Sequence, residues 1–165
     1  MLKLIGALML IAAGTLAGIM ESRRLAVRVD QLEAFLRFLS RAQTEIRFAA
    51  LPVEQIVQRH GGELQFLKRC ASGCSGGMPF TVAWQDSVNA AAKEKSFLPG
   101  DIDLLRSFGE GFGASDVEGQ ISHCELYTEL IGERLKNARD EKEKKSKLYL
   151  TLGVFGGLVA ALVLC

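Results

Sequence analysis

Apolar residues are distributed in two ways along this chain. At both ends they form runs without a charged side chain, at residues 4–20 and 148–165. Between these runs, apolar positions recur every three or four residues, which is the spacing of one helix face. No stretch alternates apolar and polar residues in the manner of a strand, so the pattern predicts an all-α protein.

The first periodic segment follows the N-terminal apolar run without a helix breaker. It reaches Pro52, and a proline disfavours helical geometry in the residue before it. We therefore expect one long helix, from the N-terminal run to about Ala49. Its apolar stripe comprises Leu25, Val29, Leu32, Leu36, Leu39, Ile46 and Ala50.

The middle of the chain predicts about four shorter helices. One begins at Pro52 and closes at the Gly61–Gly62 pair, and the next closes at Gly73. Pro79 opens a third helix, and Asp101 caps a fourth. Large aromatic side chains on these segments and on the first helix are expected in the core: Phe35, Phe38, Phe80 and Trp84.

A last helix is expected to begin near Asp116 and to continue without a breaker into the C-terminal apolar run. Its stripe repeats at three and four: Ile121, Cys124, Thr128, Ile131, Leu135 and Ala138. The predicted fold is an antiparallel bundle of about six helices, whose first and last members extend into the apolar ends.

The two apolar runs are just long enough to cross a bilayer, since a spanning helix needs about 17 to 20 apolar residues. Basic residues flank each run on the side of the central region, for example Arg23 and Lys147. The positive-inside rule then predicts a transmembrane helix at 1–20, a cytoplasmic helical bundle at 21–147 and a second transmembrane helix at 148–165, with both termini outside.

An alternative for residues 1–20 is a cleaved signal peptide, which would leave a singly anchored or secreted helical binding module. The charges that follow this run, including Arg23 and Arg24, argue against it. Each run also holds a G-x-x-x-G pattern, in which small residues let helices approach closely in lipid. We expect span packing at Gly14, Gly18, Gly153 and Gly157.

Charge narrows the possible partners. The chain has 20 basic and 19 acidic residues, and Lys3 alone of these lies outside residues 21–147. The central region is therefore formally neutral, and a nucleic-acid binder would normally carry a basic surplus. The Lys-rich residues 142–147 suit anionic lipid headgroups instead.

Few residues offer catalytic or metal-binding chemistry. The possible metal ligands are His60, Cys70, Cys74, His123 and Cys124. The Cys-x3-Cys spacing lacks the second pair that zinc sites show, and Cys124 lies on an apolar stripe. No acid–base pair is visible, so we expect neither an enzyme nor a cofactor.

The glycine-rich stretch FGEGFGASDVEGQ, residues 108–120, could be taken for a phosphate-binding loop. Such loops follow a strand, whereas a helical pattern precedes this one. Ser115 and Glu118 form a capping-box pattern. We predict that residues 109–113 end one helix and that Ser115 starts the next. The turn is a candidate interaction site, with Gly109, Glu110, Gly113, Ser115, Asp116 and Gln120.

The same turn carries a family resemblance. A helix ending in Phe-Gly, a GxSDxxGQ turn and a long helix into a C-terminal apolar run resemble the stage III sporulation protein AB family. The segments FLRFLSRAQTEIRFAALPVEQIV (residues 35–57) and AWQDSVNAA (residues 83–91) are similar to further helices of that family. The layout matches over nearly the whole chain.

The resemblance implies a role that the residues alone do not show. The family's cytoplasmic domain resembles inner-membrane platform proteins of type II secretion and type IV pilus systems. By this resemblance, the protein is a non-enzymatic platform of the mother cell–forespore channel in endospore formation, in the mother-cell membrane around the forespore. Its expected partners are a secretion-type ATPase, other membrane proteins of the apparatus, membrane lipid and further copies of itself.

Overall fold

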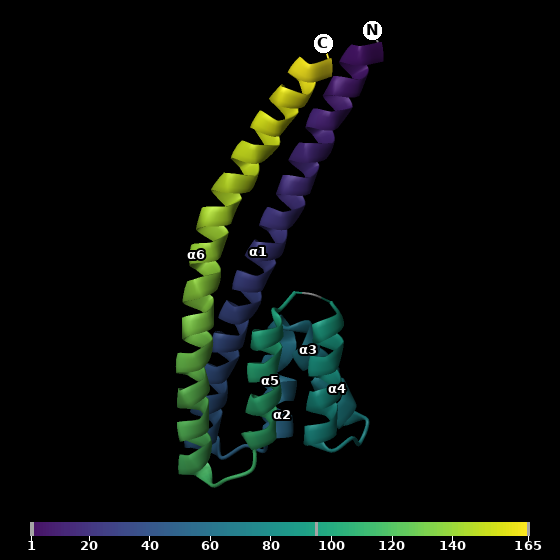
Figure 1. Ribbon diagram of the computed structural model, residues 1–165. Coiled ribbons are helices and arrows are strands. Elements are labelled where there is room, and N and C mark those ends of the chain that lie inside the picture. Colours follow the sequence, from purple (N-terminus) through teal and green to yellow (C-terminus); the bar gives the residue numbers. More distant parts are fainter. Residues whose placement is uncertain (1, 95, 165) are drawn as a thin grey trace. The chain divides into compact units, whose positions relative to one another are not determined.

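The computed structural model describes the backbone of residues 2–94 and 96–164, and the side chains of 19–94 and 96–145 with a few beyond. These residues form helices and no strand (Figure 1). The elements are α1 (Leu2–Ala49), α2 (Val53–His60), the 3₁₀ turn η1 (Gly61–Glu63), α3 (Gln65–Ser75), α4 (Phe80–Lys93), α5 (Pro99–Gly111) and α6 (Val117–Leu164). The all-α prediction with about six helices is confirmed.

The chain divides into two compact units. The first comprises Met1–Val29 with Asn137–Cys165, and the second comprises Asp30–Lys136. In the first unit, the buried guanidinium of Arg28 donates a hydrogen bond of 3.3 Å to the Glu141 carboxylate. This contact joins the parts of α1 and α6 that belong to that unit.

The second unit has an aromatic core centred on Phe108 of α5. Its ring centroid lies 5.6 Å from that of Phe35, 5.5 Å from that of Trp84 and 4.7 Å from that of Phe112. Edge and tilted contacts of this kind add to the stability gained by burying apolar area. The predicted core residues Phe35, Phe38, Phe80 and Trp84 are all buried.

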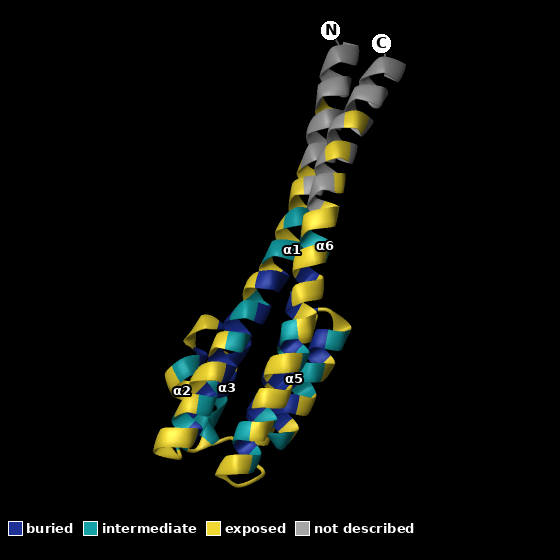
Figure 2. Cartoon of the chain, turned by 90° about the vertical axis from the view of Figure 1, so that its left-hand side faces the viewer, coloured by how far each residue is buried: buried dark blue, intermediate teal, exposed yellow. Residues whose placement is uncertain are grey.

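The buried face of α1 is wider than its apolar stripe predicts. Leu32, Leu39 and Ile46 are buried as expected, and so are residues beside the stripe, including Phe35 and Phe38. Within the second unit, α1 is contacted from more than one side. Gln43 hydrogen-bonds to Glu125 of α6, while Phe35 meets Phe66 of α3. Figure 2 shows buried and exposed positions alternating around the helices of this unit.

Some predicted helix ends are wrong. Gly73 lies inside α3, whose end falls at Ser75, because the Gly76 N–H bonds to the carbonyls of Ser72 and Gly73. Asp101 does not cap α5 from outside. The helix begins at Pro99, and the buried Asp101 carboxylate accepts the Leu98 N–H at 3.0 Å. Ala50, placed on the α1 stripe, lies beyond the helix and is exposed.

Within the part of the chain that the structure describes, no helical stretch combines the length and apolar content needed to cross a membrane. Most side chains of the two apolar runs lie outside the described residues, as do the side-chain surroundings of Gly14, Gly18, Gly153 and Gly157. The two-span arrangement and the span packing therefore stay predictions.

Candidate functional site

The glycine-rich stretch is a helix–turn–helix, as predicted, but its glycines have different roles. Gly109 lies inside α5 and Gly111 is its last residue, so the helix ends within residues 109–113 as predicted. A Cβ on Gly109 would overlap the indole of Trp84, and one on Gly111 would overlap the imidazole of His123. These glycines let two large rings pack against the α5 backbone.

Both rings also hydrogen-bond to that backbone. The Trp84 indole N–H donates to the Leu105 carbonyl oxygen at 2.8 Å, and both groups are buried. The His123 Nε2 lies 2.9 Å from the Phe108 carbonyl oxygen, which fixes this nitrogen as the protonated one. α4 and α6 are thus each anchored on α5 by an aromatic ring and a hydrogen bond.

Gly113 makes the turn itself. Its φ of +90° lies in a region that other residues rarely adopt. Its N–H donates to the Gln120 Oε1 at 2.9 Å, and the Gln120 amide donates back to the Ser115 carbonyl at 3.3 Å. The buried side chain of Gln120 therefore closes the turn from inside α6.

The start of α6 differs from the predicted capping box. Asp116, rather than Ser115, is the N-cap: its Oδ1 accepts the Gly119 N–H, and its carbonyl accepts the Gln120 N–H, both at 2.9 Å. Asp116 takes the N-cap position because α6 begins at Val117, which places the Gly119 N–H three residues after Asp116, within reach of its side chain. Glu110 lies apart from the turn and accepts a bond of 3.4 Å from Gln85 of α4.

Figure 1 shows this turn and the α1–α2 connection at the same end of the second unit. Residues of both line a groove of about 290 Å³. We call it the turn groove; its lining residues are Ile46, Ala50, Leu51, Pro52, Val53, Glu54, Gly113, Ser115, Val117 and Gln120. It includes three of the predicted turn residues, Gly113, Ser115 and Gln120. The α1–α2 side of the groove was missed, because sequence separation hides which connections meet in space.

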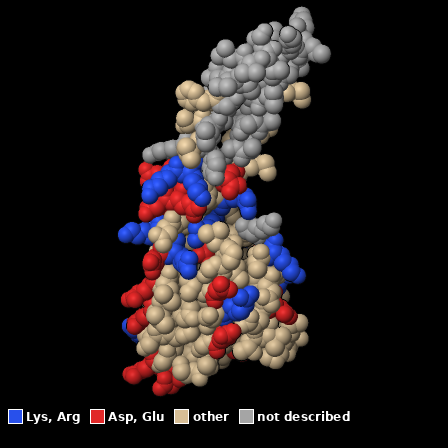
Figure 3. All heavy atoms as spheres, viewed as in Figure 1, with Lys and Arg blue, Asp and Glu red and all other residues tan. Residues whose placement is uncertain are grey.

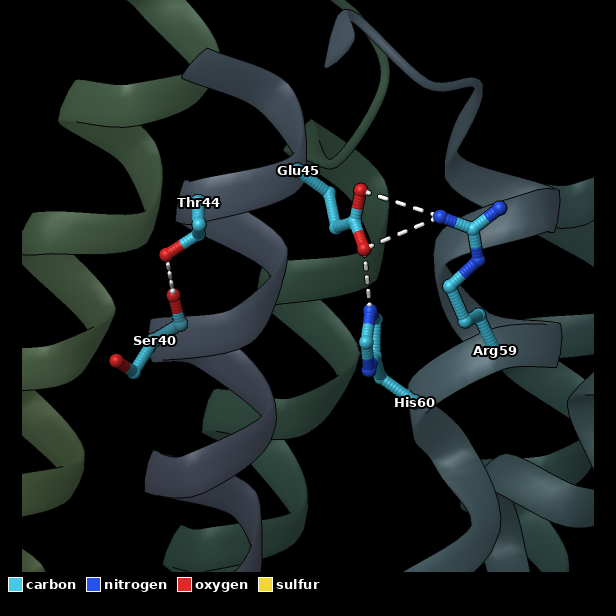
Figure 4. A network of polar contacts seen from close by, with 5 residues as sticks. All are labelled: Ser40, Thr44, Glu45, Arg59 and His60. Carbon is cyan, nitrogen blue, oxygen red and sulfur yellow. Dashed lines mark hydrogen bonds and ion pairs between the residues drawn. The ribbon is translucent and has the colours of Figure 1, made fainter. Parts of the chain in front are cut away.

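The candidate metal ligands do not form one cluster, although Cys70 and Cys74 are neighbours on α3. His60 Nε2 lies 2.8 Å from the Glu45 carboxylate, which Arg59 also contacts at 3.3 Å (Figure 4). Among the described residues, no group of three or more His, Cys, Asp or Glu side chains could hold a metal ion. His60 and His123 each have a structural partner on a neighbouring helix.

Burial raises the pKa values of the three described thiols. Burial raises the pKa of Cys124 to about 12 and also raises the pKa of Cys70, with the nearby Cys74 thiol adding to the effect. Burial raises the pKa of Cys74 as well, although that thiol is only partly covered. A thiol in this protonated form does not act as a nucleophile or bind metal readily.

Two carboxylates on the surface of the second unit are held ionised. Hydrogen bonds from His60 and then Arg59 lower the pKa of Glu45. A hydrogen bond from Arg37, together with Arg41, lowers the pKa of Glu63. These ion pairs join α1 to α2 and to the η1 turn, so they position helices.

Fold and site together define an all-helical protein. Its described histidines are engaged in contacts that join helices, and its described thiols are buried or partly buried. A profile of the family described as "Stage III sporulation protein AB" matches residues 3–165. The chain belongs to the stage III sporulation protein AB family.

The comparisons with individual proteins agree with this assignment. The chain is similar to a protein of Bacillus subtilis (strain 168) named "Stage III sporulation protein AB". The two are 25% identical over 170 residues, and the alignment covers 99% of each chain. No solved structure matches this chain.

Proposed function

We propose that this chain is a non-enzymatic membrane platform of the mother cell–forespore channel apparatus, and that its second unit docks a secretion-type ATPase. The observation that carries the proposal is the family match over residues 3–165, together with a helical unit formed by Asp30–Lys136. A compact helical unit between two apolar ends is suited to holding a motor close to a membrane.

The membrane part of the proposal rests on sequence. Residues 4–20 and 148–165 carry no charge, and basic side chains flank both. This pattern favours two spans with residues 21–147 in the mother-cell cytoplasm. Protease protection in vesicles of known orientation tests it: two spans predict cleavage within 21–147 only from the cytoplasmic side.

The same preparation tests whether residues 1–20 are retained. The intact mass of the membrane-extracted protein should equal that of the full chain. A mass lower by about 20 residues would indicate a cleaved signal peptide and would replace the two-span arrangement with a single anchor.

The non-enzymatic part is supported by the positions of the reactive side chains. His60 is engaged by Glu45, His123 by the Phe108 carbonyl, and burial keeps Cys70 and Cys124 protonated. Acidic and basic side chains are interspersed on the face seen in Figure 3, which suits a protein–protein surface better than a polyanion.

Affinity capture tests the docking role. A tagged full-length chain would be extracted from sporulating cells after brief crosslinking, and its partners identified by mass spectrometry. We expect a secretion-type ATPase crosslinked to residues between 30 and 136. A matched sample of non-sporulating cells expressing the same chain controls for non-specific capture. If repeated preparations recover only membrane partners, the second unit contacts other membrane proteins and does not bind the ATPase, and the docking proposal is wrong.

A further inference from the structure

We propose that the turn groove is a docking site for a segment of a partner protein that inserts an apolar side chain and places an arginine or lysine beside Glu54. This inference depends on the proposed function in one respect: an assembly component needs a docking surface. Its evidence is the shape, exposure and charge of the groove.

The groove offers apolar surface on both of its sides. Leu51, Pro52 and Val53 line it from the α1–α2 connection, and Val117 lines it from the start of α6. Val117 keeps 42% of its surface exposed, and Phe48, two residues before the lining residue Ala50, keeps 82%. The volume of the turn groove, 290 Å³, falls just below the range of about 300–1,000 Å³ that is typical of small-molecule pockets. The groove therefore suits one or two side chains of a partner.

The backbone of Ala50, at the edge of the groove, has a strained conformation. Its φ of +47° is in the left-handed region, where glycine is the usual residue after a helix. Alanine is strained there, and the residue lines the groove. Backbone strain of this kind clusters at binding sites and switch regions, which is a reason to test the groove for function.

The charges around the groove favour a cationic partner. Glu54 is the one charged residue of the lining, and no cation pairs with it among the described residues. Asp116 and Glu118 flank Val117 and are exposed. Acidic side chains gather in Figure 3 at the lower left, where α6 begins in Figure 1. The carbonyl end of α1 at Ala49 adds partial negative charge, whereas the first turns of α2 and α6, at Val53 and Val117, add partial positive charge, so the carboxylates decide the sign of the groove.

These features select one class of occupant. An apolar side chain gains by leaving water for the groove, and a neighbouring basic residue meets Glu54 and the end of α1. An acidic segment would be repelled by the same groups. Arg47, the basic residue in the last turn of α1, pairs instead with Glu125 of α6 at 4.0 Å.

A peptide selection tests the proposal without assuming the partner. Full-length protein in detergent would be screened against a random library of peptides about twelve residues long, displayed on phage. We expect recovered peptides to combine an aliphatic or aromatic residue with arginine or lysine. Fluorescence anisotropy of each synthetic peptide then gives its affinity for wild type and for variants.

Two matched pairs of variants locate the binding site. Glu54→Gln should weaken binding by about fivefold, and the exposed Glu129→Gln on α6 should leave it unchanged. Val117→Ser should weaken binding by at least about threefold, whereas Leu126→Ser, also exposed on α6, should not. Ala50→Gly should raise the unfolding temperature and still weaken binding, a combination that a purely structural role does not produce.

Three results would overturn the proposal: peptides without basic residues, binding that ignores both Glu54 and Val117, or self-association that Val117→Ser abolishes. The last result would assign the groove to a second copy of the chain. Because the assay uses purified protein, it can fail while capture of the ATPase succeeds, and the converse also holds.

Discussion

The indole of Trp84 packs directly against the backbone of Gly109, at a distance that leaves no space for a side chain at that position. The same indole donates a hydrogen bond to the Leu105 carbonyl, one turn earlier on α5. α4 and α5 are therefore joined by a ring held against a bare helix surface. This relationship explains a glycine that would otherwise weaken the interior of a helix.

Gly109→Ala should destabilise the protein by about 1 to 3 kcal/mol, because the added methyl forces the buried Trp84 ring to move. Thermal or urea unfolding of the full-length protein in detergent measures this change. Gly132→Ala is the matched control. Gly132 lies in α6, and a methyl group added there would meet no atom within 4 Å, so alanine should stabilise the helix by up to about 1 kcal/mol. Equal effects at both positions would contradict the packing role of Trp84.

Gly113→Ala should destabilise the turn by about 1 to 2 kcal/mol. Its φ of +90° strains any other residue, and the new methyl would approach the Val53 γ-carbons at 3.1 and 3.2 Å. Gly62→Ala in the η1 turn, where a Cβ meets nothing within 4 Å, is the control and should be nearly silent. Both variants are compared by the midpoint of urea unfolding.

Gln120→Ala should cost about 1 to 3 kcal/mol, since it leaves the Gly113 N–H and the Ser115 carbonyl without their shared partner. Gln120→Glu keeps the acceptor for Gly113 but loses the donor to Ser115, and it adds a buried charge. It should therefore fail to restore stability at neutral pH and recover part of it as the carboxyl protonates in acid. Hydrogen exchange of the Gly113 amide provides a local readout, and unchanged protection in the alanine variant would contradict the bond.

The ion pair of Glu45 with His60 and Arg59 predicts a loss of stability in acid. The pKa of Glu45 is lower in the folded protein than its ordinary value of 4.5, so its contribution is present above pH 4.5. This contribution is lost as the pH falls below 4.5 through the lowered pKa. Unfolding midpoints measured between about pH 3 and pH 7 should therefore fall less steeply for Glu45→Gln than for wild type.

Glu129→Gln is the control for this pH series, because Glu129 is exposed on α6 and no ion pair is shown for it among the described residues. It should reproduce the wild-type slope. Arg37 also lowers the pKa of Glu63, so Glu63 should contribute a separate part of the loss of folding stability at low pH. A Glu45→Gln profile identical to wild type would show that the pair adds nothing to folding.

The three thiols that the structure describes should differ in their reaction with iodoacetamide. At about pH 8 the partly exposed Cys74 is expected to be alkylated first, while Cys70 and Cys124 remain unmodified until the protein unfolds, since burial raises their pKa values and blocks access. Peptide mass spectrometry follows each site separately. Fast alkylation of Cys124 in folded protein would contradict the packing around α6 and reopen thiol chemistry as a function.

Local rules predicted much of the fold. Apolar spacing of three and four defined α1 and α6, and Pro52 correctly marked the end of α1 at Ala49. The helical pattern before the glycine-rich stretch correctly predicted a helix there, and not the strand that precedes a phosphate loop. Each of these inferences depends on residues close in sequence, where helix geometry fixes which side chains share a face.

Helix ends were predicted less well, because several residues compete for the same role. Ser115 and Asp116 are both good N-caps, and only the folded turn shows that Asp116 reaches the Gly119 N–H. Similarly, Gly73 resembles a helix end in sequence, but α3 continues past it, and a Cβ added at Gly73 would stand 3.0 Å from the Cβ of Ala83 of α4.

The sequence by itself determined the helices, the apolar ends and the family, since these follow from local spacing and from the order of motifs along the chain. Tertiary structure alone decided why Gly109 and Gly111 are glycines, where His60 and His123 are engaged, and that two distant connections form one groove. The physical reason is that a side chain's partner across a bundle depends on helix packing, and packing joins residues whose sequence separation carries no information about their contact.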